Sequence, residues 1–97
     1  MSTTSRFVQE VRTLTLTGSG ETREAALNEI LTKMRQQIMK EVGGPVLFMA
    51  PVGLEIEQES AKHETEKFLG LLWPRTRTRF NLDARIQVEV RWLQFIE

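Results

Sequence analysis

His63 is the only histidine of this 97-residue chain, and the chain has no cysteine. Glu64 follows it directly, and Asp83 belongs to the strand that we expect to pair with it. A single imidazole without a cysteine or a serine motif makes neither a nucleophile–base pair nor a metal-binding cluster. We therefore expect His63 to be an exposed strand residue, and we expect no catalytic residue, metal site or cofactor. A small enzyme that uses His63 as its titratable group is the weakest alternative.

Three carboxylates alternate along the sequence at Glu55, Glu57 and Glu59. On a strand they would share one face at a spacing of about 6.5–7 Å, where they could bind a cation. The same pattern is typical of a solvated face whose carboxylates pair with basic side chains such as Arg85 and Arg91. We favour the second interpretation.

Three arginines alternate with threonines and would share one face of a strand: Arg75, Arg77 and Arg79. With Trp73 beside them, they could hold phosphates and stack a base. The chain has 13 basic and 13 acidic residues and no net charge, which argues against nucleic acid as a partner. Pairing with the carboxylates of Glu64 and Glu66 is the plainer explanation.

The segment before these arginines is strongly apolar, and its large side chains are Phe68, Leu69, Leu71, Leu72 and Trp73. If it forms the tip of a hairpin, alternation exposes apolar groups on both sides. An exposed patch of that kind usually marks a contact with a protein or a membrane. The alternative is that the tip folds back onto the apolar residues 46–50 and completes the core.

A strand over residues 80–92 is the clearest structural signal. Even-numbered residues from Phe80 to Trp92 are apolar and odd-numbered residues are polar, without exception. This period of two predicts a strand with one buried face. Residues 54–72 are its expected hairpin partner. A three-residue loop, Leu72–Pro74, keeps even residues opposite even ones and sets Ile56 against Val90, Leu54 against Trp92 and Glu55 against Arg91. Longer odd loops preserve the same parity.

The first half of the chain predicts a strand followed by a helix. Residues 6–17 end in a β-branched alternation that places Leu14 and Leu16 on one face. The run Gly18-Ser19-Gly20 then breaks the strand; it lacks the lysine and the spacing of a phosphate-binding loop, so we interpret it as a plain turn. Thr22 is the first candidate and Ser19 the second for the N-cap of a helix that runs to about Val42.

This helix carries an apolar stripe of Leu27, Ile30, Leu31, Met34, Ile38 and Val42, and it stops at the run Gly43-Gly44-Pro45. Residues 45–53 form either an edge strand or a buried connection. The most apolar alternating strand should be central. The sequence therefore predicts a single α+β domain over residues 1–97, of order β-α-β-β. Its antiparallel three-stranded sheet has the order first, third, second strand, with a long C-terminal hairpin and the helix on one face.

Composition places this domain among soluble proteins. The hydrophobic fraction is 40%, and no apolar run approaches the roughly 20 residues of a spanning helix. Residues 1–5 are polar, and no signal-peptide core follows them. The absence of cysteine fits a cytoplasmic location.

Two resemblances add to this picture. The stretch Glu66–Arg75, followed by the alternating strand to Trp92, resembles a small bacterial family, the domain of unknown function family 4312. That resemblance implies no assigned activity or catalytic residue, and a genomic neighbourhood of multi-pass membrane proteins, so a membrane protein is one possible partner. The stretch Leu16–Leu27 is similar to the opening of dodecins, small flavin-storing shells with the same strand-helix-strand-strand order. The long hairpin and residues 45–53 depart from dodecins, so only the topology is carried over.

We therefore expect a non-enzymatic interaction or assembly module, which docks on a protein partner or on another copy through the apolar hairpin tip. Arg75, Arg77 and Arg79 would orient that contact by pairing with carboxylates. The alternative function is a dodecin-like oligomer that binds a small ligand where subunits meet, with Trp92 or Trp73 as the stacking surface.

Overall fold

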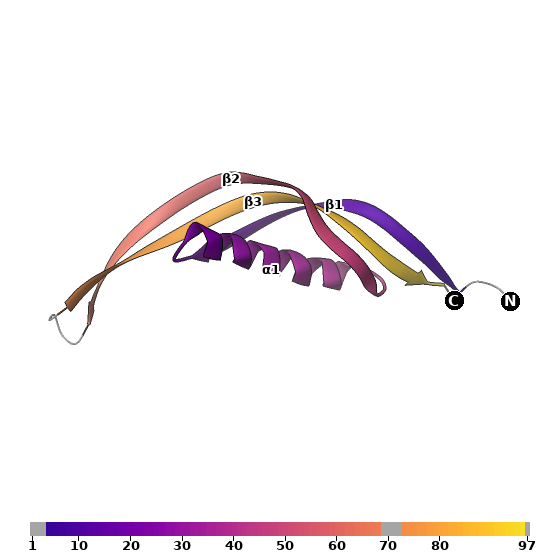
Figure 1. Cartoon of the computed structure of the whole chain (residues 1–97), viewed down its shortest axis with the longest axis horizontal. Helices are drawn as coiled ribbons and strands as arrows, with labels where there is room; N and C mark the ends of the chain where they lie inside the picture. The colour runs from indigo at the N-terminus through magenta and orange to yellow at the C-terminus, as the bar shows by residue number, and fades with distance from the viewer. Residues whose placement is uncertain (1–3, 69–72, 97) are drawn as a thin grey trace.

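The computed structural model describes residues 4–68 and 73–96. The elements are β1 (Ser5–Gly20), α1 (Arg23–Glu41), β2 (Val46–Phe68) and β3 (Trp73–Phe95). The three strands form one antiparallel sheet of order β1-β3-β2, and α1 lies along the concave side of the arched sheet (Figure 1). The predicted α+β fold and strand order are confirmed.

The core lies between α1 and the even-numbered residues of β3. Ala84, Ile86, Val88 and Val90 are fully buried, and Leu82 and Trp92 are nearly so. Ala26, Ile30, Met34 and Ile38 meet them from the helix, and Leu14 meets them from β1. The strict alternation of β3 is therefore the consequence of one covered and one open face, as predicted.

β1 is longer than predicted, because residues 18–20 remain in the strand. Its pairing with β3 runs unbroken from Ser5 opposite Phe95 to Gly20 opposite Phe80. A Cβ at Gly18 would lie 2.6 Å from Ile30 Cγ1 and would also collide with the backbone oxygen of Ala26. The expectation of a turn here was wrong: the glycine lets the helix backbone approach the strand closely.

The helix begins and ends almost where its sequence indicates. The Thr22 hydroxyl accepts a 3.0 Å hydrogen bond from the Ala25 N–H, as a side-chain N-cap does. Val42 is the C-cap, and its N–H donates to Ile38 O at 3.0 Å. Beyond it, Gly44 passes so close to Leu93 O that a side chain would collide with that backbone oxygen.

The hairpin register differs from the predicted one. Leu54 pairs with Ile86, Glu55 with Arg85 and Ile56 with Ala84, while pairing continues to Phe68 opposite Trp73. The predicted loop Leu72–Pro74 is therefore wrong, because Trp73 and Pro74 already belong to β3. Residues 69–72 lie outside the described structure.

Even residues nevertheless face even residues in the middle of the hairpin. Near the tip, Phe68 opposite Trp73 pairs an even with an odd position. One extra residue of β2, Glu57, is inserted between the pairs formed by Ile56 and Gln58, and this bulge restores the even pairing. Leu47 and Val52 are inserted in the same way. The three bulges make β2 the longer path around the arch that is visible in Figure 1.

The helix covers two strands and leaves the third open. α1 packs against β1 and β3, and an α-helix about 10 Å wide spans only two strands set about 4.8 Å apart. Leu54 and Ile56 of β2 lie on the helix side of the sheet and are each 42% exposed. The edge-strand alternative for residues 45–53 is thus correct from Val46 onward, since β2 is an edge strand.

Candidate interaction surface

The hairpin continues well beyond the helix, and we call residues 60–68 and 73–81 the hairpin arm. The first turn of α1 lies beside Glu59, since Arg23 forms an ion pair with that residue. From there nine residues of β2 continue to Phe68, which at about 3.3 Å each extend about 30 Å. Ser60, Ala61, Lys62 and His63 are all exposed. Figure 1 shows this part of β2 and β3 leaving the helix behind.

The arm gives the molecule its shape. The chain measures 75 × 27 × 14 Å and has a radius of gyration of 19.5 Å. A compact domain of this length has a radius of gyration of about 12–13 Å. An isolated two-stranded ribbon is marginally stable in water. The arm is therefore the part of the fold that the chain itself stabilises least.

The predicted tip residues lie at the end of this arm or outside the described residues. Phe68 ends β2, and Trp73 begins β3 as its Cα partner. Leu69, Leu71 and Leu72 lie outside the described residues. Val46–Ala50 are at the opposite end of β2 from Phe68, so they do not cover the end of the hairpin. Phe68 and its partner Trp73 therefore lie far from residues 46–50, contrary to what the fold-back alternative requires.

The arginine comb lies along β3 within the arm. Arg75 is the Cα partner of Glu66, and Arg77 is the Cα partner of Glu64. The predicted pairing with carboxylates falls on side chains that lie outside the described part of the structure, and only the backbone register is given. Arg79 is exposed, and its Nη2 donates to the Ser19 hydroxyl at 3.0 Å, which ties the base of the arm to β1.

His63 is exposed on β2, as predicted, with Nδ1 3.0 Å from the Thr78 hydroxyl oxygen. Asp83 hydrogen-bonds to β1 instead: its Oδ1 accepts from the Thr17 hydroxyl at 2.8 Å. Among the side chains that the structure describes, residues 4–63 and 78–96, no cluster of three or more metal-binding groups occurs.

Glu55, Glu57 and Glu59 do not share one face of β2, because the bulge at Glu57 places Glu55 and Glu59 on opposite faces. Glu55 pairs with Arg85 at 2.6 Å on the open face. Glu59 pairs with Arg23 on the helix side, and this contact raises the pKa of Arg23 above its ordinary value. The expected pairing with Arg91 is wrong: Arg91 pairs with Glu89 at 3.0 Å.

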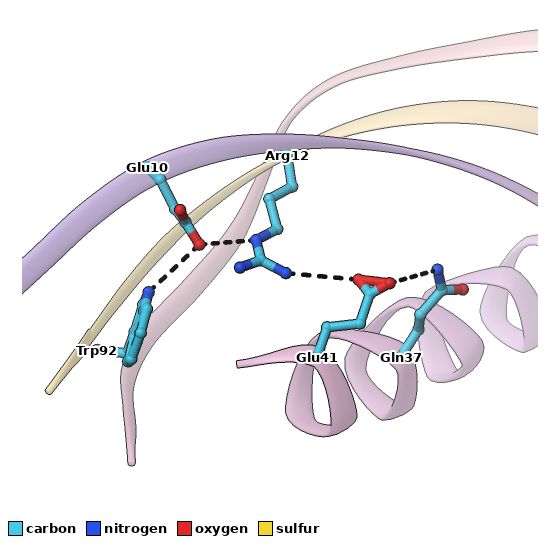
Figure 2. A network of polar contacts seen from close by, with 5 residues as sticks. All are labelled: Glu10, Arg12, Gln37, Glu41 and Trp92. Carbon is cyan, nitrogen blue, oxygen red and sulfur yellow. Dashed lines mark hydrogen bonds and ion pairs between the residues drawn. The ribbon is translucent and has the colours of Figure 1, made fainter. Parts of the chain in front are cut away.

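Trp92 anchors the other end of the molecule, and it is only 8% exposed. Its Nε1 donates to Glu10 Oε1 at 3.3 Å, and the same oxygen accepts from Arg12 Nε at 2.6 Å. Arg12 Nη1 continues to Glu41 Oε2 at 3.5 Å, and Glu41 accepts from Gln37 at 3.1 Å (Figure 2). This network ties β1 to the end of α1. Trp92 is a core residue, which disfavours it as the stacking surface that the alternative function assigned to Trp92 or Trp73.

Sequence reasoning missed the apolar residues of the open face. Phe7, Val11 and Phe95 are each more than half exposed, and Phe48 is 40% exposed. The Arg91 guanidinium covers the Phe48 ring at 4.5 Å. The odd positions of β1 carry this signal, because Phe7 and Val11 interrupt an otherwise polar face.

A hollow beside the helix lies under the uncovered strand. Leu27, Ile56 and Leu82 form its apolar floor, and Arg23, Glu24 and Glu59 form its rim. Its volume of about 270 Å³ is below the roughly 300–1,000 Å³ of small-molecule pockets. The hollow is therefore better suited to an inserted side chain than to a cofactor.

Fold and surface together define an open-faced α+β protein with an extended hairpin and uncovered sheet edges. The family description "Domain of unknown function (DUF4312)" matches residues 10–93 of the chain. The chain belongs to this family. No curated protein and no solved structure matches it. No helix in the described part of the chain is long and apolar enough to cross a membrane.

Proposed function

We propose that this protein is a non-enzymatic interaction and assembly module that docks through the hairpin arm. The observation that carries the proposal is the arm itself: beyond the last residue of β1, residues 62–68 and 73–79 continue as a two-stranded ribbon of about 23 Å that neither β1 nor the helix covers. A ribbon of that kind gains stability when a second surface buries it. The sequence adds apolar side chains at its end (Phe68, Leu69, Leu71, Leu72 and Trp73).

In this proposal the arginines of the arm determine how the partner is oriented. Arg75 and Arg77 are in register with carboxylates of β2. Exposed ion pairs contribute little to stability, but they select the orientation of a partner and exclude like-charged surfaces. Docking by Arg79 would replace its exposed hydrogen bond to Ser19.

The test is a double variant at the tip, Leu72→Asp with Trp73→Ala. We expect it to lower the oligomer mass measured by light scattering while the circular dichroism spectrum stays unchanged, because the core between α1 and β3 is not altered.

The matched control is Leu47→Asp with Val52→Ala. Like the two tip residues, these bulge residues are apolar. They are more than half exposed and lie toward the opposite end of β2 from the tip. The control should assemble like the natural sequence. Natural assembly in the tip variant, or equal loss in both variants, would exclude docking through the arm.

A further inference from the structure

A second surface for assembly is the free edge of β1. β1 is an edge strand whose other side pairs with β3 over 16 residues without a single register shift. Long edges of that kind invite pairing with another strand, and proteins that avoid it interrupt the edge with proline, bulges or charge. β2 has these interruptions, with Pro51 and three bulges. β1 has no proline and no bulge.

The hydrogen-bonding groups that β1 leaves free can be assigned. Thr4 O accepts from the Ile96 N–H, so even-numbered residues turn their backbone groups toward β3. Thr17 O accepts from Lys33 Nζ at 2.6 Å, which places the backbone groups of odd-numbered residues on the free edge. In a strand the two sets alternate. Residues Phe7, Gln9, Val11, Thr13 and Thr15 therefore present N–H and C=O groups along the edge.

The sequence of this edge is complementary to itself about Val11. In an antiparallel pair of two copies centred on that residue, Glu10 lies opposite Arg12 of the second copy, and Arg12 lies opposite the second copy's Glu10. Opposite charges in facing positions favour such pairing, and like charges oppose it. Glu10 and Arg12 already lie on one side of β1, joined at 2.6 Å (Figure 2). Two copies would form a ring of four alternating charges.

Pairing the two β1 edges about other residues is less favourable. Moving the centre to Glu10 sets two carboxylates against each other, and moving it to Arg12 sets two guanidinium groups against each other. A centre at Thr13 places Thr17 inside the ladder, where Lys33 already occupies its carbonyl oxygen. A centre at Gln9 sets Arg6 against Arg12 of the second copy. Charge and the lysine therefore favour the register centred on Val11 over these alternatives.

The helices do not obstruct this arrangement. α1 is 19 residues long, about 28 Å, and it covers β1 from Gly18, where the backbones meet, to Arg12, which pairs with Glu41. Residues 5–11 extend past the helix end. The two-fold axis at Val11 sets residues 12–18, which the helix covers, opposite residues 4–10 of the other copy, so the two helices are offset along the strands.

We propose that two copies of this chain pair antiparallel through their β1 edges, with Val11 on the two-fold axis, to form a continuous six-stranded sheet. The ladder would contain about ten new backbone hydrogen bonds over residues 7–15 of each chain. Val11 is 60% exposed in the single chain and would contact its own symmetry mate. This surface is distinct from the hairpin arm, so the two proposals stand or fall separately.

The test uses the absence of natural cysteines. In Val11→Cys, the two thiols face each other across a hydrogen-bonded pair with Cα atoms about 5.5 Å apart, which is within disulfide range. In the control Thr15→Cys, the side chain is also exposed and lies on the same face. Its symmetry mate lies eight residues along the strand, about 27 Å away.

We expect mild oxidation of the full-length Val11→Cys protein to give a linked dimer as the main product on a non-reducing gel. Thr15→Cys should give less than about a tenth as much, because Cα atoms more than 7 Å apart cannot be bridged. Equal linking in both variants would overturn the proposal.

A second pair of variants tests the pairing without cross-linking. Val11→Lys sets two ammonium groups together at the axis, whereas Val11→Thr keeps a neutral β-branched residue. We expect at least a roughly tenfold weaker dimer for the lysine variant by sedimentation, because facing like charges oppose pairing, and little change for threonine. A lysine variant that dimerises like the natural chain would refute the register, and a natural chain that is monomeric at every concentration would refute the dimer.

Discussion

Gly18→Ala probes the contact that sets the helix on the sheet. A methyl group at Gly18 would lie 2.6 Å from Ile30 Cγ1 and would collide with the Ala26 carbonyl oxygen, which is helix backbone and cannot swing aside. Forcing extra volume into a packed site costs about 1–3 kcal/mol. Removing a glycine also restricts the unfolded chain, which returns about 0.4–1 kcal/mol. The expected net loss in the free energy of unfolding is thus about 1–2 kcal/mol.

The measurement is thermal unfolding followed by circular dichroism. For a domain of this size, each kcal/mol corresponds to a fall of about 4–8 °C in melting temperature, so Gly18→Ala should melt about 4–16 °C lower. Gly53→Ala is the control: the three atoms nearest to its new methyl group all belong to the flexible Gln87 side chain, and the closest is the amide oxygen at 2.7 Å. It should melt within a few degrees of the natural chain. An unchanged melting temperature for Gly18→Ala, or the same fall in both variants, would show that α1 does not rest on this glycine.

Three further substitutions test the core, the helix cap and the surface by urea unfolding. Ile86→Ala removes a fully buried side chain and should lose about 2–5 kcal/mol; a loss below about 1 kcal/mol would contradict its place in the core. Thr22→Ala removes the hydroxyl that accepts from Ala25 N–H and should cost about 0.5–2 kcal/mol, whereas an unchanged stability would mean that the cap does not form. Glu55→Gln breaks an exposed pair with Arg85 and should lower the free energy of unfolding by less than about 1 kcal/mol, and by still less in high salt. A larger loss, or one that does not change with salt, would contradict the exposed position of this pair in the structure.

The sequence was sufficient to predict the order of the elements and the central strand. The even positions of residues 80–92 had to be buried by something, and the stripe through Ile30, Met34 and Ile38 was the matching surface. The cap at Thr22 follows from its position just before the apolar stripe of the same helix. Each of these features depends on neighbours in sequence or on a simple period.

The hairpin register could not be read in the same way. The parity argument assumed a strand without bulges, but one extra residue at Glu57 reverses the parity between the tip and the middle of the hairpin. The bulges have no sequence signal as regular as a period of two. The role of Gly18 was missed for a related reason, because only the packed helix shows why no side chain fits there.

The exposed surfaces were predicted only in part. The sequence indicated an apolar hairpin tip, but it did not show that α1 covers only two of three strands or that the arm extends about 30 Å past it. The self-complementary edge around Val11 is present in the sequence. It becomes meaningful only once β1 is placed at the edge and Lys33 marks which backbone groups are free.

Assembly is the central claim, and the molar mass of the purified full-length chain in solution tests it most directly. Sedimentation velocity over a range of concentrations should give at least twice the 11.2 kDa of one copy, with a shift toward the single copy only on dilution. A single species of 11.2 kDa at the highest concentration would contradict self-assembly through either surface.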